Sequence, residues 1–561
     1  MIVNFSDYIR QINFPLQYKK IIKNLKNKKI VIYGAGSFFL YLIENYDFSP
    51  LNIIGISDTK FEKEDEGKYF KGFRIIPKDK ILDYEPEVIL LGVQNYYSLL
   101  FDFETNIFYD TNIQIIPIAK RIGINERKRN SQMLTQIFKI DWMKILSSKR
   151  KRIVLKRLLW ESYRRSMYSR VKKDSQKVRK KLAQKVKNEK LKVVFTLHQA
   201  EKWKCETIYR LMEQEKIFDP YILITIPESD NPDYPSLKKN HFDETIKFFT
   251  TRNYKVLEGY DWQKKEYIPF NEFSPDIIFY QQPWNVERQQ GPLETSKYAL
   301  TCYVPYFIAN AGNDIEYGLD FHLQLYKHYI LNEKIKSFYA QKMLNNGDNL
   351  VVSGHPQLDY FWLNRKEIDS AEKRYVIYAP HWSINVPVEN YATFEWSGKF
   401  MLEYAKSHPE IEWIFKPHPI LRHRLLNQNV MTEKEAEEYW REWAKAGVVY
   451  ESGDYMDFFK HARAMITDCG SFLTEFFLTK QPVIHMISDS AIPYNPSAAD
   501  IVKNYYKAHN IDELERHLDT VIIQKNDYMK EQRINALKNM NLDNCYAAKN
   551  IIDDLKSELI Q

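Results

Sequence analysis

The chain has 561 residues, 15% of them aromatic, and a formal net charge of +8. This length exceeds what one hydrophobic core usually supports, so we expect two to four domains, and the aromatic content excludes a largely disordered chain. The four cysteines lie far apart and form no Cys-x-x-Cys pair, which argues against a disulfide framework or a zinc site and favours a reducing compartment.

The N-terminus lacks the basic and long apolar regions of a signal peptide, and no stretch of about 18 apolar residues occurs in the sequence. We therefore expect a cytoplasmic protein, either free or attached peripherally to the inner face of the cell membrane.

Residues 1–126 are predicted to form a small Rossmann-like module. An apolar strand over residues 28–32 is followed by a helical pattern, and two further strands are expected over residues 51–56 and 87–91. Strands alternating with helical stretches indicate a β-α-β arrangement with a parallel sheet.

The turn after the first strand carries part of a dinucleotide-binding fingerprint. Gly34 and Gly36 occupy its first two glycine positions, and Asp58 follows near the distance at which an acid would meet a ribose. The third glycine position is Phe39, so the fingerprint is incomplete. A bound nucleotide is one interpretation; a degenerate module that binds another ligand or packs against a partner is the other.

Residues 127–190 are predicted to be a basic helical linker. Between residues 141 and 190, 19 Lys and Arg stand against four acidic residues, and Leu155, Leu158 and Trp160 belong to a partial apolar face. Such a helix can lie on an anionic membrane surface. Nucleic acid would also attract this charge, but no recognised nucleic-acid motif accompanies it, so we expect none to bind. A solvated linker without a partner is the remaining interpretation.

Residues 191–370 are predicted to form the first of two doubly wound domains. Strands are expected over residues 191–197, 220–226, 256–257, 276–280 and 301–304. Ligands of open parallel sheets bind beyond the carboxyl ends of the strands. His198 lies at such an end, as do the aromatic and amide residues from Tyr280 to Trp284 and from Tyr303 to Tyr306.

Residues 371–561 are predicted to form the second domain, with a final amphipathic helix over residues 546–560. A strand over residues 374–379 leads to Pro380-His381, and a strand over residues 412–415 leads to Lys416-Pro417-His418-Pro419. Histidine at these positions suits acid-base work near neutral pH. His381 is our first choice for a general base and His198 the second.

The stretch from Ala464 to Met486 is predicted to be a strand, turn, helix and strand. Its turn, Asp468-Cys469-Gly470-Ser471, would place several N–H groups at a helix N-terminus, where the helix dipole favours a phosphate. Glu475 lies one helical turn beyond Ser471 on the same face and could meet a ribose hydroxyl. An ordinary capped helix is the alternative at this point.

Taken in order, these motifs resemble the CDP-glycerol:poly(glycerophosphate) glycerophosphotransferase family of teichoic acid and capsule polymer synthesis, over residues 191–555. The motifs that carry the resemblance are Ser353-Gly354-His355-Pro356-Gln357-Leu358-Asp359, Tyr378-Ala379-Pro380-His381-Trp382, Phe415-Lys416-Pro417-His418-Pro419, and Thr467-Asp468-Cys469-Gly470-Ser471 with Glu475.

The resemblance implies a GT-B fold, a CDP-activated polyol phosphate as donor, a polymer or lipid-linked acceptor, and attachment to the cytoplasmic membrane face. It implies that His418, Gly470 and Ser471 serve the donor pyrophosphate and that Glu475 binds the ribose. We extend the donor-binding set to Lys416, Asp468, Ser353, Gly354 and His355, and we expect no metal or other cofactor.

One departure concerns the Trp-His-Gly-Thr-Pro motif that members of the family's polymerase branch carry in the first domain, whose histidine is the proposed catalytic base. The matching residues here are Cys302-Tyr303-Val304-Pro305-Tyr306, without a histidine. Either another group takes the proton, or the donor and acceptor differ from those of the family's best-known branch. His198 and His381 are the available replacements. Two other functions therefore stay open: a GT-B glycosyltransferase that uses a nucleotide sugar, and a non-catalytic membrane-associated scaffold.

Overall fold

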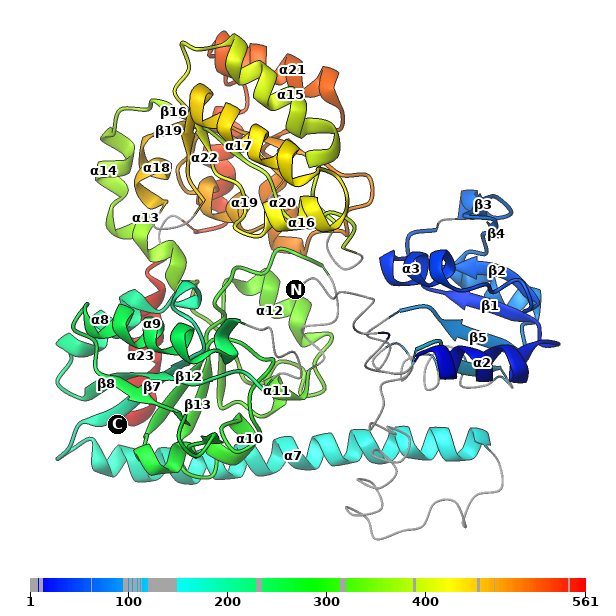
Figure 1. Ribbon diagram of the computed structural model, residues 1–561. Coiled ribbons are helices and arrows are strands. Elements are labelled where there is room, and N and C mark those ends of the chain that lie inside the picture. The colour runs from blue at the N-terminus through cyan, green and yellow to red at the C-terminus, as the bar shows by residue number, and fades with distance from the viewer. Residues whose placement is uncertain are drawn as a thin grey trace. The chain divides into compact units, whose positions relative to one another are not determined.

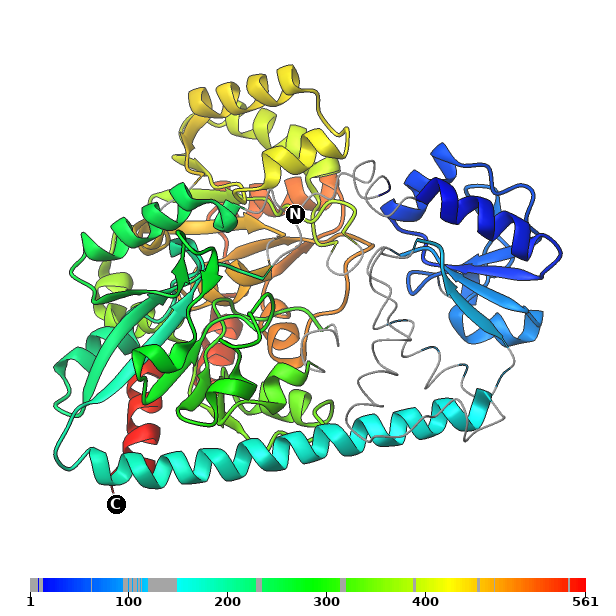
Figure 2. The same cartoon turned by 60° about the horizontal axis from the view of Figure 1, so that its bottom comes forward.

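The computed structural model is shown in Figure 1, and Figure 2 turns it by 60°. It describes residues 9, 14–61, 63–93, 99, 103, 108, 111, 113–119, 149–228, 235–312, 319–386, 390–451, 455–468, 470–542 and 545–560, with the backbone alone for residues 37 and 149–159. Two compact units are present: Met1–Tyr163 with Asn385–Asn390, and Arg164–Ile384 with Tyr391–Gln561. Each is described by itself.

The N-terminal unit contains a four-stranded parallel sheet in the order β2-β1-β5-β6. Its two central strands, β1 and β5, are buried on both faces, as helix-covered parallel sheets require. The prediction of a Rossmann-like module is confirmed. Its elements are α2 (Phe14–Leu25), β1 (Ile30–Tyr33), α3 (Ser37–Asn45), β2 (Ile53–Ser57), the hairpin β3 (Tyr69–Phe70) and β4 (Phe73–Arg74), β5 (Val88–Leu91) and β6 (Gln114–Pro117).

The second unit begins with a seven-stranded parallel sheet in the order β15-β14-β13-β12-β7-β8-β9. Its strands are β7 (Leu191–Leu197), β8 (Phe218–Ile224), β9 (Val256–Glu258), β12 (Ile277–Tyr280), β13 (Leu300–Tyr303), β14 (Lys327–Ile330) and β15 (Leu350–Val352). Its helices are α8 (Glu206–Gln214), α9 (Lys239–Thr250), α10 (Pro292–Thr295), α11 (Asp320–Leu323) and α12 (Glu333–Ala340), and β10 (Tyr260–Asp261) pairs with β11 (Glu266–Tyr267).

The second sheet of this unit has six parallel strands in the order β18-β17-β16-β19-β20-β21. Its strands are β16 (Tyr375–Ala379), β17 (Trp413–Phe415), β18 (Gly447–Val449), β19 (Ala462–Thr467), β20 (Val483–Met486) and β21 (Tyr506–Ala508). Its helices are α15 (Phe394–Ser407), α16 (Leu421–Asn427), α17 (Glu433–Ala446), α18 (Met456–His461), α19 (Gly470–Phe477), α20 (Pro496–Val502), α21 (Ile511–His517) and α22 (Lys530–Asn539).

Both sheets of the second unit follow the 3-2-1-4-5-6 strand order of doubly wound domains, the first with one strand added. The predicted fold class, a GT-B-like pair of Rossmann-like domains preceded by a smaller one, is confirmed. The order also fixes where ligands are expected, at the crevice beyond the carboxyl ends of β16 and β19 in the second sheet.

The chain crosses between these two domains twice. After α13 (Asp359–Leu363) and α14 (Arg365–Ser370) it enters the second sheet, and α23 (Ala547–Leu559) returns to the first. We expected residues 371–561 to belong to one domain. Ile551, Ile552 and Leu555 of α23 instead pack in the core of the first sheet, because its apolar residues share one helical face that lies against α8 (Figures 1 and 2).

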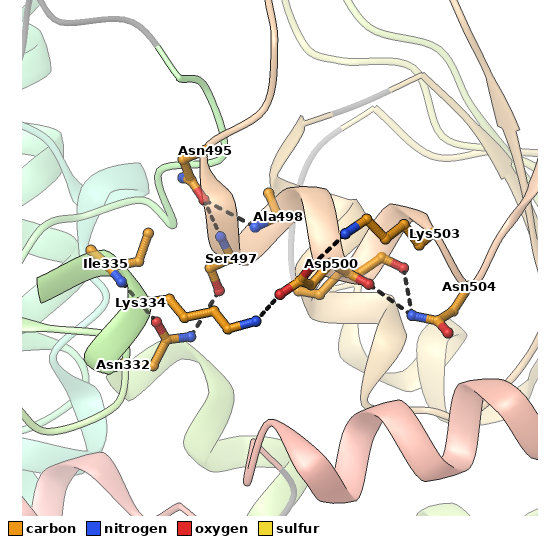
Figure 3. A network of polar contacts seen from close by, with 10 residues as sticks. Asn332, Lys334, Ile335, Asn495, Ser497, Ala498, Asp500, Lys503 and Asn504 are labelled. Carbon is orange, nitrogen blue, oxygen red and sulfur yellow. Dashed lines mark hydrogen bonds and ion pairs between the residues drawn. The ribbon is translucent and has the colours of Figure 1, made fainter. Parts of the chain in front are cut away.

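Polar side chains also join the two domains (Figure 3). The Asn332 amide caps α12 through Ile335 N at 3.0 Å and donates to Ser497 Oγ of α20 at 2.7 Å. Lys334 pairs with Asp500, which also pairs with Lys503 at 2.8 Å. Helix-capping residues therefore form part of the junction that positions the two sheets.

Helix α7 (Lys149–Lys185) covers part of the predicted linker; residues 127–148 and the side chains of residues 149–159 lie outside those described. Val178 and Leu182 of α7 are buried in the core of the first sheet, and Lys185 pairs with Asp276 at 2.7 Å. The C-terminal part of α7 is thus packed against this domain. Among the described residues, no helix is long and apolar enough to cross a membrane.

Candidate functional site

The candidate site lies where β16, β17 and β19 end side by side. Ala379 pairs with Thr467, and Tyr378 pairs with Phe415. His381, Lys416 and His418, which the sequence placed in separate motifs, therefore follow neighbouring strands at one sheet edge. This is the edge at which open parallel sheets bind ligands.

His381 and His418 face one another with ring centroids 5.5 Å apart. His418 Nδ1 accepts from the N–H of Ile420 at 3.3 Å. Ser383 Oγ accepts from two backbone N–H groups and lies 2.8 Å from His381 Nδ1, so its own hydrogen points to that nitrogen. In the neutral form both rings consequently carry their hydrogen on Nε2.

Burial keeps both rings neutral. It lowers the pKa of His418 to about 3, with the Lys416 charge as the second cause, and it lowers the pKa of His381 well below the ordinary range, with His418 as the second cause. The pair therefore offers two neutral N–H donors. Such N–H groups can donate to phosphate oxygens, whereas a nitrogen that already carries a hydrogen cannot remove a proton.

Asp468 is fully buried, and its carboxylate is used within the chain. Oδ1 accepts from His381 N at 2.6 Å, and Oδ2 accepts from Thr393 N at 2.6 Å and Thr393 Oγ1 at 2.8 Å. Burial raises the pKa of Asp468 to about 6 although these bonds oppose the shift. Through these contacts Asp468 positions the His381 loop and the start of α15; its contact with the donor stays a prediction.

Gly470, the first residue of α19, has open space beside its Cα. A Cβ built on Gly470 meets no other atom within 4 Å, and Ser471 is half-buried. Asn310, from the loop after β13, donates to Gly470 O and accepts from Thr474 Oγ1 at 2.9 Å. The positive end of the helix dipole and this space together can hold an anionic group. Cys469 of the turn lies outside the described residues.

Glu475 is fully buried on α19 beside aromatic and cationic groups. Its Oε2 accepts from the Tyr455 hydroxyl at 2.6 Å. Burial raises the pKa of Glu475 to about 7; Tyr455, Lys204 and Lys416 oppose that rise. The buried Lys416 Nζ lies 5.8 Å from the Tyr455 ring centroid and 5.9 Å from that of Phe472. Lys416 thus brings positive charge to the same side of α19.

His198 is buried at the end of β7, among amides of the first domain. Gln282 Nε2 lies 3.0 Å from its Nδ1 and also donates to Trp284 O at 2.8 Å, while Gln282 Oε1 accepts from Lys202 Nζ at 2.9 Å. The amide orientation makes His198 Nδ1 an acceptor and leaves the hydrogen on Nε2. Burial lowers the pKa of His198 to about 3 and that of Lys202 to about 8.

Ser353, Gly354 and His355 make structural contacts at the junction of the two domains. Ser353 O accepts from Asn550 Nδ2 at 3.0 Å, and Gly354 has φ +85° with Cys545 Sγ against it. His355 Nε2 donates to Pro305 O at 2.9 Å, and its Nδ1 accepts from Gln357 N at 3.3 Å. These contacts hold the three residues in place, and their binding to the donor stays a prediction.

In the N-terminal module, the carboxylate of Asp58 serves the glycine turn itself. Asp58 Oδ2 accepts from Ala35 N at 2.6 Å, and Lys60 Nζ donates to Ala35 O at 3.0 Å. Gly34 has φ +109°, and a Cβ there would meet Val93 at 2.6 Å; Gly36 precedes α3 as its N-cap. A nucleotide at this turn stays a prediction.

Several residues of the site are not predicted from the sequence. Tyr455 and Lys204 lie in no recognised motif. Asn310 contacts α19 from the loop after β13, which belongs to the first domain of the second unit. Gln357 belongs to the motif of residues 353–359, and this motif is the only feature of the sequence that points to it. Within the described ranges, no three His, Cys, Asp or Glu side chains lie where they could hold a metal ion together.

A scan against protein-family models finds no match to the chain, and a search of curated proteins finds none. Solved structures do match. A UDP-GlcNAc 2-epimerase from Neisseria meningitidis bound to UDP-GlcNAc is 13% identical at a TM-score of 0.44, covering 66% of this chain and 100% of that one. A variant of the wall teichoic acid polymerase TagF is 11% identical at a TM-score of 0.43, covering 72% and 98%. Since these TM-scores lie below 0.5, we take nothing about function from them.

Proposed function

We propose that the chain is a transferase that moves a polyol phosphate, such as glycerol phosphate, from a CDP-activated donor to a hydroxyl of a cell-surface polymer or its lipid-linked precursor. The observation that supports this most is the gathering of Lys416, two N–H donors from His381 and His418, and the N-terminal turn of α19 at one sheet edge. Such a set is complementary to a diphosphate.

In the proposed reaction, the acceptor oxygen forms a bond to the β-phosphorus of the donor. The bond from that phosphorus to the bridging oxygen breaks, CMP leaves with the electron pair, and the acceptor hydroxyl loses its proton. Phosphoryl transfer depends mainly on positioning and charge neutralisation. Lys416, His381 and His418 would neutralise the diphosphate, and the α19 amides would orient it.

The general base stays a proposal. We expected His381 first and His198 second, but in each ring Nδ1 accepts a hydrogen bond and Nε2 holds the hydrogen. Either histidine would have to take the proton at Nδ1 and lose the hydrogen bond that this nitrogen accepts from Gln282 or Ser383. The proton can instead leave late in the reaction, since the transition state for phosphoryl transfer is loose.

A donor screen with the full chain tests the proposal. CDP-glycerol, CDP-ribitol and nucleotide sugars would be incubated with an acceptor polymer, and the released nucleotide identified. We expect CMP, and we expect His418→Ala to lower its rate of formation about 10²-fold or more, the usual effect of removing one such donor.

His423→Ala, in an exposed position of α16, is the matched control and should leave the rate unchanged. Release of a nucleoside diphosphate would favour a glycosyltransferase. A scaffold would show no release with any donor, and its polymer production in cells would survive His418→Ala at normal protein level.

The proposed membrane contact would be electrostatic. Met167, Val171, Val178 and Leu182 of α7 are buried, so this part of the helix has no free apolar face. Its outward side carries Arg170, Lys173, Lys180 and Lys181, all exposed. Each basic residue near an anionic surface contributes about 1 kcal/mol, and salt screens the attraction.

Replacing Arg170, Lys173, Lys180 and Lys181 by Gln should therefore release the protein from vesicles containing anionic lipid at low salt, measured by co-sedimentation. The charge-matched control replaces four exposed lysines elsewhere, Lys247, Lys366, Lys399 and Lys434, and should stay bound. Equal binding of both variants would count against this part of α7 as the contact.

A further inference from the structure

Lys202 is a lysine without a carboxylate partner at an edge of the first domain. It ends the short 3₁₀ turn Ala200–Lys202, just beyond the carboxyl end of β7, and its side chain is half-buried. Its Nζ donates to Gln282 Oε1 at 2.9 Å and lies 4.8 Å from the centroid of the Tyr306 ring. Within the part of the chain that the structure describes, no carboxylate forms an ion pair with this nitrogen.

Contacts between the two domains place this edge next to the candidate site. Asn310, in the same loop as Tyr306, donates to Gly470 O in the N-terminal turn of α19. Lys204, in the loop after β7, acts electrostatically on Glu475 of the same helix. The loops after β7 and β13 therefore border the turn that would orient the donor diphosphate. An acceptor hydroxyl that reaches the diphosphate from the first domain would pass this edge.

The hydrogen bonds around Lys202 let its amine lose a proton without losing its partner. Gln282 Nε2 donates to Trp284 O at 2.8 Å and lies 3.0 Å from His198 Nδ1, so the amide oxygen faces the lysine. A neutral amine has two N–H groups and a lone pair. One N–H can stay on Gln282 Oε1 while the lone pair accepts a proton. In His198 and His381, by contrast, Nδ1 already accepts a hydrogen bond and Nε2 holds the hydrogen.

The surroundings of Lys202 favour the neutral amine. Burial lowers its pKa to about 8, and the exposed Glu201 opposes this shift only in part. Gln282 and Tyr306, which contact Nζ from other elements, offer no carboxylate. The neighbouring His198 is neutral, because burial lowers its pKa to about 3 with the Lys202 charge as the second cause. About one tenth of the molecules thus carry a neutral Lys202 at pH 7, and about half at pH 8.

We propose that Lys202 is the general base that removes the proton from the acceptor hydroxyl. This rests on the proposed transfer of a polyol phosphate and adds to it the residue that activates the acceptor. As the acceptor oxygen bonds to the β-phosphorus and CMP leaves with the electron pair, the hydroxyl proton passes to the lone pair of Nζ. Gln282 Oε1 and the face of the Tyr306 ring then stabilise the ammonium, which returns its proton to water after the product leaves.

The pH dependence of CMP release tests this proposal, with the full chain, CDP-glycerol and an acceptor polymer in a single turnover. Lys202→Arg keeps the charge and cannot become neutral, so we expect it to lower the rate about 10²-fold or more at pH 8. The ratio of wild-type to variant rate should rise about tenfold per pH unit below pH 8 and level off above it. Glu475 titrates in both proteins and cancels in this ratio. Lys216→Arg, at an exposed lysine of the same domain, should match the wild type.

Lys202→Met separates proton removal from positioning. Added methylamine should restore part of the rate of this variant, whereas it could not replace a side chain that only holds Gln282 in place. The affinity for CDP, measured by calorimetry, should equal that of the wild type. Full activity of Lys202→Arg would show that the site needs a positive charge rather than a base, and would overturn the proposal.

A direct titration of the Lys202 amine by NMR, assigned with the Lys202→Arg variant, needs no substrate. We expect a pKa near 8, and a value near the ordinary 10.5 would overturn the proposal whichever donor the protein uses. Absence of CMP release from the wild type at every pH would instead contradict the proposed function. The two failures can therefore be told apart.

Discussion

Asp468→Ala is expected to lower the free energy of unfolding by about 3 kcal/mol. The carboxylate accepts from His381 N, Thr393 N and Thr393 Oγ1 in a fully buried position. Alanine leaves His381 N and Thr393 N without their acceptor, whereas Thr393 Oγ1 still has Ser397 Oγ at 3.3 Å. Each buried unsatisfied donor costs about 1 to 3 kcal/mol, partly offset because a buried charge is removed. Urea unfolding of the full chain would measure the change.

Asp468→Asn keeps one acceptor oxygen and should fall between wild type and Asp468→Ala. Asp489→Ala, at an exposed aspartate, should change stability by no more than about 0.5 kcal/mol. A loss under 1 kcal/mol for Asp468→Ala would show that the His381 loop does not depend on this carboxylate. Direct binding of the donor would then be the favoured role of Asp468.

The sheets could be predicted where strands are short apolar runs between turn residues, as at Leu191–Leu197 and Tyr375–Ala379. Strand β14 (Lys327–Ile330) could not, because it begins with Lys327 and His328. Lys327 is tolerated there since its Nζ pairs with Asp554 at 2.7 Å and Glu558 at 3.2 Å on α23. That helix lies more than 200 residues further along the chain, so local pattern gives no sign of it.

The candidate site could likewise be predicted from the sequence only in part. His381, Lys416 and His418 follow predicted strands, so the rule that ligands bind at strand ends makes each of them a candidate site residue. What the side chains do there depends on partners from other segments. Ser383 sets the hydrogen position on His381, and Tyr455 orients Gln357. No spacing rule contains such contacts, so the sequence predicts a base at rings whose Nε2 carries the hydrogen in the fold.

Glu475→Gln is expected to stabilise the protein at high pH and to weaken nucleotide binding. The pKa of Glu475 is raised from 4.5 to about 7, chiefly by burial. The folded state therefore binds more protons than the unfolded state between these values, so its stability falls as pH rises from about 4.5 through 7. The full difference corresponds to about 3 kcal/mol. Glutamine cannot ionise and escapes this loss.

The two proteins should thus be similarly stable at pH 5, whereas at pH 8 the variant should be more stable by about 2 to 3 kcal/mol. Asp468 titrates in both proteins and cancels in the difference, and Glu272→Gln, at an exposed glutamate, should show no pH-dependent difference. CDP binding at pH 8 should weaken about 10- to 100-fold, if Glu475 makes the charge-assisted hydrogen bond to the ribose that the family resemblance implies. A gain in stability together with a loss of CDP affinity would indicate a carboxylate that is buried because it binds a ligand. Equal stability of the two proteins at pH 8 would contradict the raised pKa of Glu475. Unchanged CDP affinity would contradict its role in donor binding.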